Sequence, residues 1–202
     1  MTSAPHEISA LPVVVPLAAL AFAAMLWRLH RRAAWSIPRV VVAAAVCVYG
    51  AGIIANTVFP ILIDSPASGP SWPSLINLAL FVDTEWFDML SNVLVFVPLG
   101  FLLPLVTRAR TPRRVALYGF AISLTMETAQ FVNAVTGHGG HIADVNDLLA
   151  NSLGAVVGYA LFRACLRLPA ARRLADAARW TEVPWDDQLA VSAIAETDPD
   201  SP

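Results

Sequence analysis

Long apolar runs alternate with short polar connections along most of this 202-residue chain. A bilayer core about 30 Å thick requires about 20 apolar residues in a helix that rises about 1.5 Å per residue. Five runs reach this length, which predicts an all-α polytopic membrane protein with about five transmembrane helices. The predicted spans are residues 8–27, 40–63, 87–106, 115–133 and 144–168.

The pattern divides the chain into a transmembrane domain, residues 1–168, and a cytoplasmic tail, residues 169–202. The tail begins with "ARRLADAARW", a basic amphipathic stretch suited to the inner leaflet. From Thr181 the tail is acidic and contains proline, which is typical of disorder. Between the second and third spans, "DSPASGPSWP" predicts a loop. The following "SLINLALF" is too short to span, so it is expected to lie in the interface or to re-enter the membrane.

The composition agrees with this class. The chain is 57% hydrophobic and only 14% charged, with a mean hydropathy of +0.62. The net charge of −2 gives no indication of a nucleic-acid partner. Cys47 and Cys165 lie in apolar segments without metal-ligand spacing, so they are interpreted as small buried hydrophobes.

The arginines predict the orientation of the helices. All 13 basic residues are arginines, and they fall between spans one and two, between spans three and four, and at or after the end of span five. Short arginine-rich connections stay in the cytoplasm, so the N-terminus is predicted outside and the C-terminus inside. No basic residue precedes the first apolar run, which favours a retained anchor over a cleaved signal peptide. The arginines are Arg28, Arg31, Arg32 and Arg39, then Arg108, Arg110, Arg113 and Arg114, then Arg163, Arg167, Arg172, Arg173 and Arg179.

Polar residues gather near the predicted outer ends of four spans. Glu127 falls in the outer half of the fourth span, and Gln130 follows on the same helical face. Because a charge at mid-membrane costs about 3 kcal/mol, these groups are expected to face protein or water. Deeper in the last span, the GxxxG pattern from Gly154 to Gly158 predicts close approach by another helix. The predicted members of an outer-leaflet recess are Asn56, Asp88, Asn92, Glu127, Gln130, Asp144, Asp147 and Asn151.

Simpler roles remain open for several of these residues. Asn92, Asn151 and Ser152 also fit interhelical hydrogen bonding. Asp144 also fits a helix N-cap, and Asp147 fits a first-turn acid stabilised by the helix dipole.

Glu127 is too deep for capping, which favours a functional or internally paired role. His141 is the nearest candidate partner by depth. The series His138, His141 and Asp144 has a weak metal-ligand spacing, but "GHGGH" favours a flexible loop, so neither a metal nor a cofactor is predicted. The motifs HExxH, GxSxG and CxxC and a glycine-rich phosphate loop are absent from the sequence.

Three blocks of this chain resemble the VanZ-like family of small bacterial membrane proteins. They are "NVLVFVPLGFLLPL" at 92–105, Glu127 with Gln130, and "HIADVNDLLANSLGAVVGY" at 141–159. With the weaker "NLALF" at 77–81, the resemblance covers a core of residues 77–162. In the third block the chain has His141 where the family has arginine, and histidine carries a charge only near or below about pH 6.5.

The resemblance implies an integral protein of the bacterial plasma membrane and cell envelope. Some relatives are associated with resistance to teicoplanin-type glycopeptide antibiotics. The chain matches the family pattern at Asn92, Glu127, Gln130, Asp144, Asp147 and Asn151.

The leading hypothesis is a recess that binds a cell-wall precursor, a lipid headgroup or a glycopeptide-type antibiotic, in a protein surrounded by membrane lipids. Its predicted ligand-binding residues are Asn92, Glu127, Gln130, His141, Asp144, Asp147 and Asn151. The alternative is an intramembrane hydrolase or transferase that acts on a lipid-linked substrate. There, Glu127 and either Asp144 or Asp147 would divide general acid and base roles. A proton-coupled carrier is less favoured, because the inner halves of the spans lack polar groups.

Overall fold

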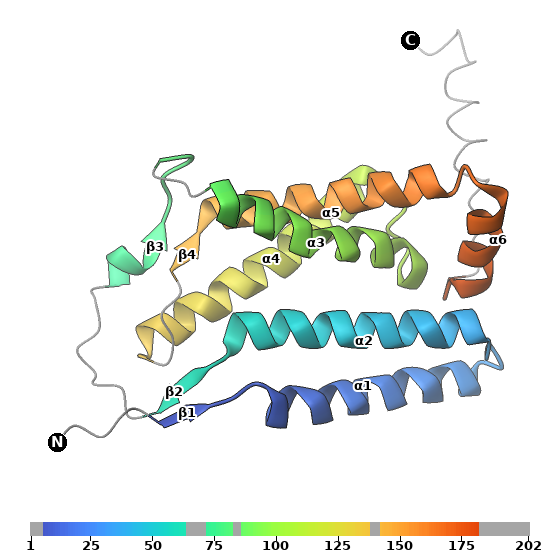
Figure 1. Ribbon diagram of the computed structural model, residues 1–202, viewed down its shortest axis with the longest axis horizontal. Coiled ribbons are helices and arrows are strands. Elements are labelled where there is room, and N and C mark those ends of the chain that lie inside the picture. Colours follow the sequence, from blue (N-terminus) through green and yellow to red (C-terminus); the bar gives the residue numbers. More distant parts are fainter. Residues whose placement is uncertain (1–5, 64–71, 83–85, 138–141, 182–202) are drawn as a thin grey trace, which may run out of the picture.

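The computed structural model describes residues 6–63, 72–82, 86–137 and 142–181 as a helical bundle with two small strand pairs at one end (Figure 1). The long helices are α1 (Leu11–Arg31), α2 (Ile37–Val58), α3 (Trp86–Val106), α4 (Pro112–Val135) and α5 (Val145–Cys165). The shorter α6 (Pro169–Ala178) follows them, and a one-turn 3-10 helix, η1 (Trp72–Leu75), precedes α3. The strands are β1 (His6–Ile8), β2 (Ile61–Ile63), β3 (Ile76–Asn77) and β4 (Ala143–Asp144).

Each of the five long helices is long and apolar enough to cross a membrane, which confirms the predicted polytopic bundle. Every one of them also exposes large apolar side chains, such as Leu20, Val48, Leu94, Leu117 and Leu161. In water such a surface would be strongly unfavourable, whereas lipid chains solvate it. The chain is therefore a membrane protein with membrane lipids around it.

The second helix ends earlier than the apolar run predicts. It stops at Val58, and residues 61–63 form β2, which pairs antiparallel with β1 in the register Ile8↔Ile61. The cause is Pro60, because a proline disfavours the helical conformation of the residue before it and has no N–H to donate. Phe59 is accordingly extended, with φ −111° and ψ 155°.

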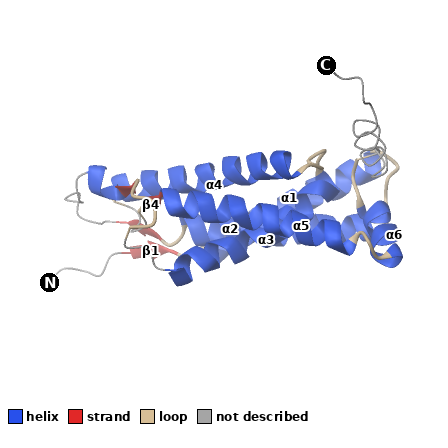
Figure 2. Cartoon of the chain, turned by 90° about the horizontal axis from the view of Figure 1, so that it is seen from above, coloured by secondary structure: helices blue, strands red, loops and turns tan. Residues whose placement is uncertain are grey.

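Helix α5 lies at the centre of the packing (Figure 2), and it runs parallel to α3 and antiparallel to α4 (Figure 1). A Cβ atom added at Gly154 or Gly158 would overlap the carbonyl oxygens of Val93 or Val97 on α3. The GxxxG pattern therefore allows the close approach that the sequence predicts, and α3 is the helix that approaches. By contrast, α1 packs mainly against α2 at the edge of the bundle (Figure 1).

The two ends of the bundle differ. The α1–α2, α3–α4 and α5–α6 connections lie at the end where α6 turns back beside α2 (Figure 1), and the arginines lie in these connections, in the adjoining helix ends, or in and just after α6. We call this the arginine end. The strands lie at the opposite end, which we call the strand end. Residues 182–202, predicted to form most of the acidic tail, lie outside the described residues, and the side of the membrane that each end faces remains a prediction.

Candidate functional site

The site is assembled where β3 meets the start of α5. Strand β3 pairs in parallel with β4 in the register Ile76↔Ala143 and Asn77↔Asp144. This pairing brings the segment that follows η1 beside the first turn of α5. The short apolar stretch before α3, whose place the sequence left open, therefore supports the polar end of the last span.

Asp144 is the N-cap of α5. Its Oδ1 accepts hydrogen bonds from the backbone N–H of Asn146 at 2.7 Å and from the Asn146 side chain at 2.9 Å. Its Oδ2 accepts a hydrogen bond from Nδ2 of Asn77 at 2.9 Å. Both carboxylate oxygens thus have partners, and Asp144 primarily fixes the start of α5 against β3.

Glu127 approaches this cap from α4. Its side chain is only 7% exposed, and its Oε2 accepts a hydrogen bond from the backbone N–H of Asp144 at 2.9 Å. The other carboxylate oxygen accepts no hydrogen bond from the part of the chain that the structure describes. Asp147, in the first turn of α5, and Asp144 both lie close enough to interact electrostatically with Glu127. The structure therefore brings the three predicted acids together.

Gln130 follows Glu127 by three residues on α4, which places both on one helical face. Its Oε1 is buried and has no hydrogen-bond donor among the described residues. An unsatisfied buried acceptor costs about 1–3 kcal/mol. Gln130 and the second oxygen of Glu127 are thus two acceptors to which a ligand could donate.

Asn146 is the residue of the site that the sequence did not single out. It is 3% exposed, its Nδ2 donates to the carbonyl oxygen of Ala79 at 3.0 Å, and its Oδ1 accepts from the N–H of Phe81 at 3.0 Å. It therefore holds the segment after β3 against α5. Helical periodicity gives no signal for it, because its partners are backbone groups in a distant segment.

Asn151 lies deeper in α5 and bonds across to α4. Its Nδ2 donates to Oγ of Ser123 at 2.9 Å, and both residues are buried. This is the interhelical role that remained open for Asn151. The sequence also held a signal for Ser123, because it stands four residues before Glu127 and therefore lies on the same face of α4.

The remaining predicted residues are less involved. Asn92 is half-buried on α3, and its side chain makes no hydrogen bond to a described residue. Asp88 and Asn56 are exposed, and the polar residue that α2 buries is Thr57. Ser152 donates to the Leu148 carbonyl oxygen within its own helix at 2.7 Å.

His138 and His141 lie outside the described residues, so the structure does not test the pairing of His141 with Glu127. Within the described ranges, no group of three His, Cys, Asp or Glu residues is arranged to hold a metal ion.

Comparison with known proteins gives one finding. A model of the VanZ/LLP1 family matches residues 41–167, more than half of the chain, from within α2 to just past the end of α5. The chain matched none of the curated proteins and none of the solved structures with which it was compared.

Proposed function

The chain belongs to the VanZ/LLP1 family, and from this premise we propose that it is a plasma-membrane protein of the bacterial cell envelope whose strand end binds a ligand. The proposed site is the polar recess formed by Glu127 and Gln130 of α4 with Asp144 and Asp147 at the start of α5. The proposed ligand is a cell-wall precursor, a lipid headgroup or a glycopeptide-type antibiotic, and it binds from outside the cell.

The observation that carries this proposal is the environment of Glu127. A carboxylate that is 7% exposed within an apolar span is costly unless it is paired or bound. The N–H of Asp144 satisfies only one of its oxygens. Packing alone does not require an acid here, because a glutamine would accept the same hydrogen bond without the charge.

The available groups indicate what kind of ligand chemistry the site favours. The second oxygen of Glu127 and Oε1 of Gln130 are acceptors, and the neighbouring Asp147 adds negative charge. Such a site favours hydroxyl, amide or ammonium groups and disfavours phosphate. Sugar hydroxyls, peptide amides and amines occur in cell-wall precursors, in glycopeptide antibiotics and in some lipid headgroups, so the proposal places these parts of the ligand in the recess.

Glu127→Gln tests the proposal, because glutamine preserves the shape and the acceptor for the Asp144 N–H. We expect the substitution to change susceptibility to teicoplanin-type glycopeptides and lipoglycopeptides in cells that express the protein at wild-type level. A charge-assisted hydrogen bond contributes about 1.5–3 kcal/mol, so affinity for the bound antibiotic or precursor should fall by about tenfold or more.

The matched control is Asp88→Asn, which removes an exposed acid in the first turn of α3, at the same end of the bundle as Glu127. It should leave susceptibility and affinity at wild-type values. Unchanged susceptibility for Glu127→Gln across the whole antibiotic panel, or an equal effect of both substitutions, would contradict the proposal.

The direction from which the ligand enters is tested separately. In a background that carries Cys47→Ala and Cys165→Ala, a membrane-impermeant maleimide should label Asp88→Cys in intact cells. It should label Arg173→Cys, on the exposed face of α6, only after the membrane is broken. The reverse pattern would place the strand end in the cytoplasm.

A second candidate function is an intramembrane hydrolase or transferase that acts on a lipid-linked substrate. The observation that favours it is the position of Glu127 within electrostatic reach of two further carboxylates, which is the kind of grouping that separates an acid from a base. Product formation from isoprenoid-phosphate or lipid-linked substrates by the wild type, but not by Glu127→Gln, would support this candidate. No turnover across the substrate panel, with or without divalent cations, would remove it.

A further inference from the structure

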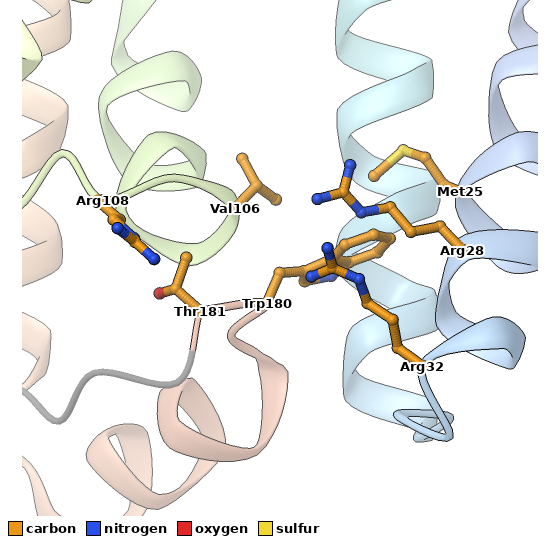
Figure 3. A pocket seen from close by; sticks show the side chains of 7 residues that line it. All are labelled: Met25, Arg28, Arg32, Val106, Arg108, Trp180 and Thr181. Carbon is orange, nitrogen blue, oxygen red and sulfur yellow. The ribbon is translucent and has the colours of Figure 1, made fainter.

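A pocket lies at the arginine end, remote from Glu127. Its volume is about 570 Å³, and its walls come from the end of α1, the α3–α4 connection and the segment after α6. Figure 3 shows the guanidinium groups of Arg28 and Arg32 beside the Trp180 ring, with Arg108 and Thr181 across the space. The lining residues are Met25, Arg28, Arg32, Val106, Arg108, Trp180 and Thr181.

Hydrogen bonds hold the segment after α6 in place. The backbone N–H of Trp180 donates to the carbonyl oxygen of Leu105 at 2.8 Å. The Nε of Arg39 donates to the carbonyl oxygen of Arg179 at 2.9 Å. Arg110 donates to Oγ of Thr181 at 2.7 Å, so the Thr181 hydroxyl proton remains available to a ligand. The pocket wall is thus tied to α2 and to the end of α3.

The pocket has an excess of positive charge. Among the described residues, no carboxylate lies within ion-pair distance of Arg28, Arg32 or Arg108, whereas Arg179 pairs with Asp176 at 3.4 Å. Burial lowers the pKa of Arg110, which donates to the pocket residue Thr181, and the charge of Arg179 lowers it further. Positive groups therefore crowd this end.

The pocket also contains a buried donor. The indole Nε1 of Trp180 has no hydrogen-bond acceptor in the described part of the chain. The groups around this space are thus guanidinium groups and a hydroxyl, with an indole N–H buried in the wall, and all of them donate. An anion with several acceptor oxygens satisfies such a set, and phosphate is the common biological example.

Its position in the bundle indicates where the phosphate comes from. Met25 and Val106 give the pocket an apolar side where α1 and α3 approach the end of the hydrocarbon region. A phospholipid would place its phosphate among the arginines and its glycerol and acyl carbons against these two residues. We propose that this pocket binds the phosphate group of an anionic phospholipid.

The test measures binding of soluble short-chain lipids to the purified full-length protein in detergent. Dihexanoyl phosphatidylglycerol should bind more tightly than dihexanoyl phosphatidylcholine and more tightly than inorganic phosphate. Arg28→Gln combined with Arg32→Gln should weaken phosphatidylglycerol binding by about thirtyfold, since each basic residue near an anionic lipid surface contributes about fivefold.

The matched control is Arg113→Gln combined with Arg173→Gln, which removes two exposed charges from the same end without touching the pocket. It should change the affinity by less than about threefold. Trp180→Phe, which keeps an aromatic ring and removes the indole N–H, should also weaken binding. Thermal unfolding in detergent checks that every variant is folded, and only folded variants are compared.

Three outcomes would overturn the proposal. The first is equal binding of phosphatidylglycerol and phosphatidylcholine. The second is an equal loss of affinity in the pocket and control pairs of substitutions. The third is inorganic phosphate that binds as tightly as the lipid with the same dependence on Arg28 and Arg32, which would assign the pocket to a soluble anion.

Discussion

The two ends of the bundle present opposite hydrogen-bonding chemistry. At the strand end, Glu127 and Gln130 offer acceptors without described donors. At the arginine end, Arg28, Arg32 and Arg108 offer donors without described carboxylates, and the Trp180 indole offers another. One end therefore suits ligands rich in hydroxyl, amide or ammonium groups, and the other suits phosphate.

The ends also differ in how they are held together. At the strand end, the side chains of Asp144 and Asn146 join the segment from β3 to Phe81 to the start of α5, and Glu127 joins α4 to it by accepting from the backbone N–H of Asp144. At the arginine end, Arg39 and Trp180 donate to backbone carbonyl oxygens and so fix the segment after α6. In both places some polar groups build the framework, which leaves others available to a ligand. A polar residue in this membrane bundle is therefore not by itself a sign of binding.

The largest expected effect comes from breaking the framework that both ends share. Gly158→Leu would force a side chain into the backbone of Val97, and backbone has no alternative rotamer to adopt. We expect a loss of at least about 3 kcal/mol of stability and of ligand binding at both ends. Thermal unfolding in detergent measures the loss. Gly52→Ala is the control, because a Cβ there meets nothing within 4 Å, and it should be neutral or slightly stabilising.

A smaller effect should separate the two ends. Asn146→Ala removes the partners of Ala79, Phe81 and Asp144, which should cost about 1–3 kcal/mol and release the segment after β3. Hydrogen exchange should rise in residues 76–82 and remain unchanged in α6. Increased exchange at both ends would show that the strand end and the arginine end are coupled, and it would contradict their independence.

The smallest expected effect concerns the hydrogen bond between Asn151 and Ser123. Such bonds between transmembrane helices average about 0.6 kcal/mol. A double-mutant cycle with Asn151→Ala and Ser123→Ala should therefore give a coupling near this value, measured by unfolding in detergent. A coupling close to zero would mean that Asn151 does not stabilise the α4–α5 contact.

Much of the framework could be predicted from the sequence, because helix length, arginine distribution and glycine spacing are local signals. The GxxxG segment and the grouping of Glu127 with Asp144 follow from such signals together with the order of the spans. The pairing of β3 with β4 could not be predicted in this way, because two-residue strands have no periodicity to detect. The docking of α6 against α2 could not be predicted either, because it depends on contacts between segments that are far apart in the sequence. Asn56 was expected in the recess, but it is exposed at the end of α2 and the buried polar residue there is Thr57.

The division of ligand chemistry between the two ends is tested most directly by native mass spectrometry of what co-purifies with the protein. Three forms are compared: the wild type, Glu127→Gln with Asp144→Asn, and Arg28→Gln with Arg32→Gln. Asparagine is as good an N-cap as aspartate, so the first double variant should keep the cap on the N–H of Asn146, and it gives up only the hydrogen bond from Asn77. We predict that it loses an envelope-derived ligand and retains phospholipid, and that the arginine variant does the reverse. If both variants lost the same ligand, or if neither lost any, the two ends would not be separate binding sites.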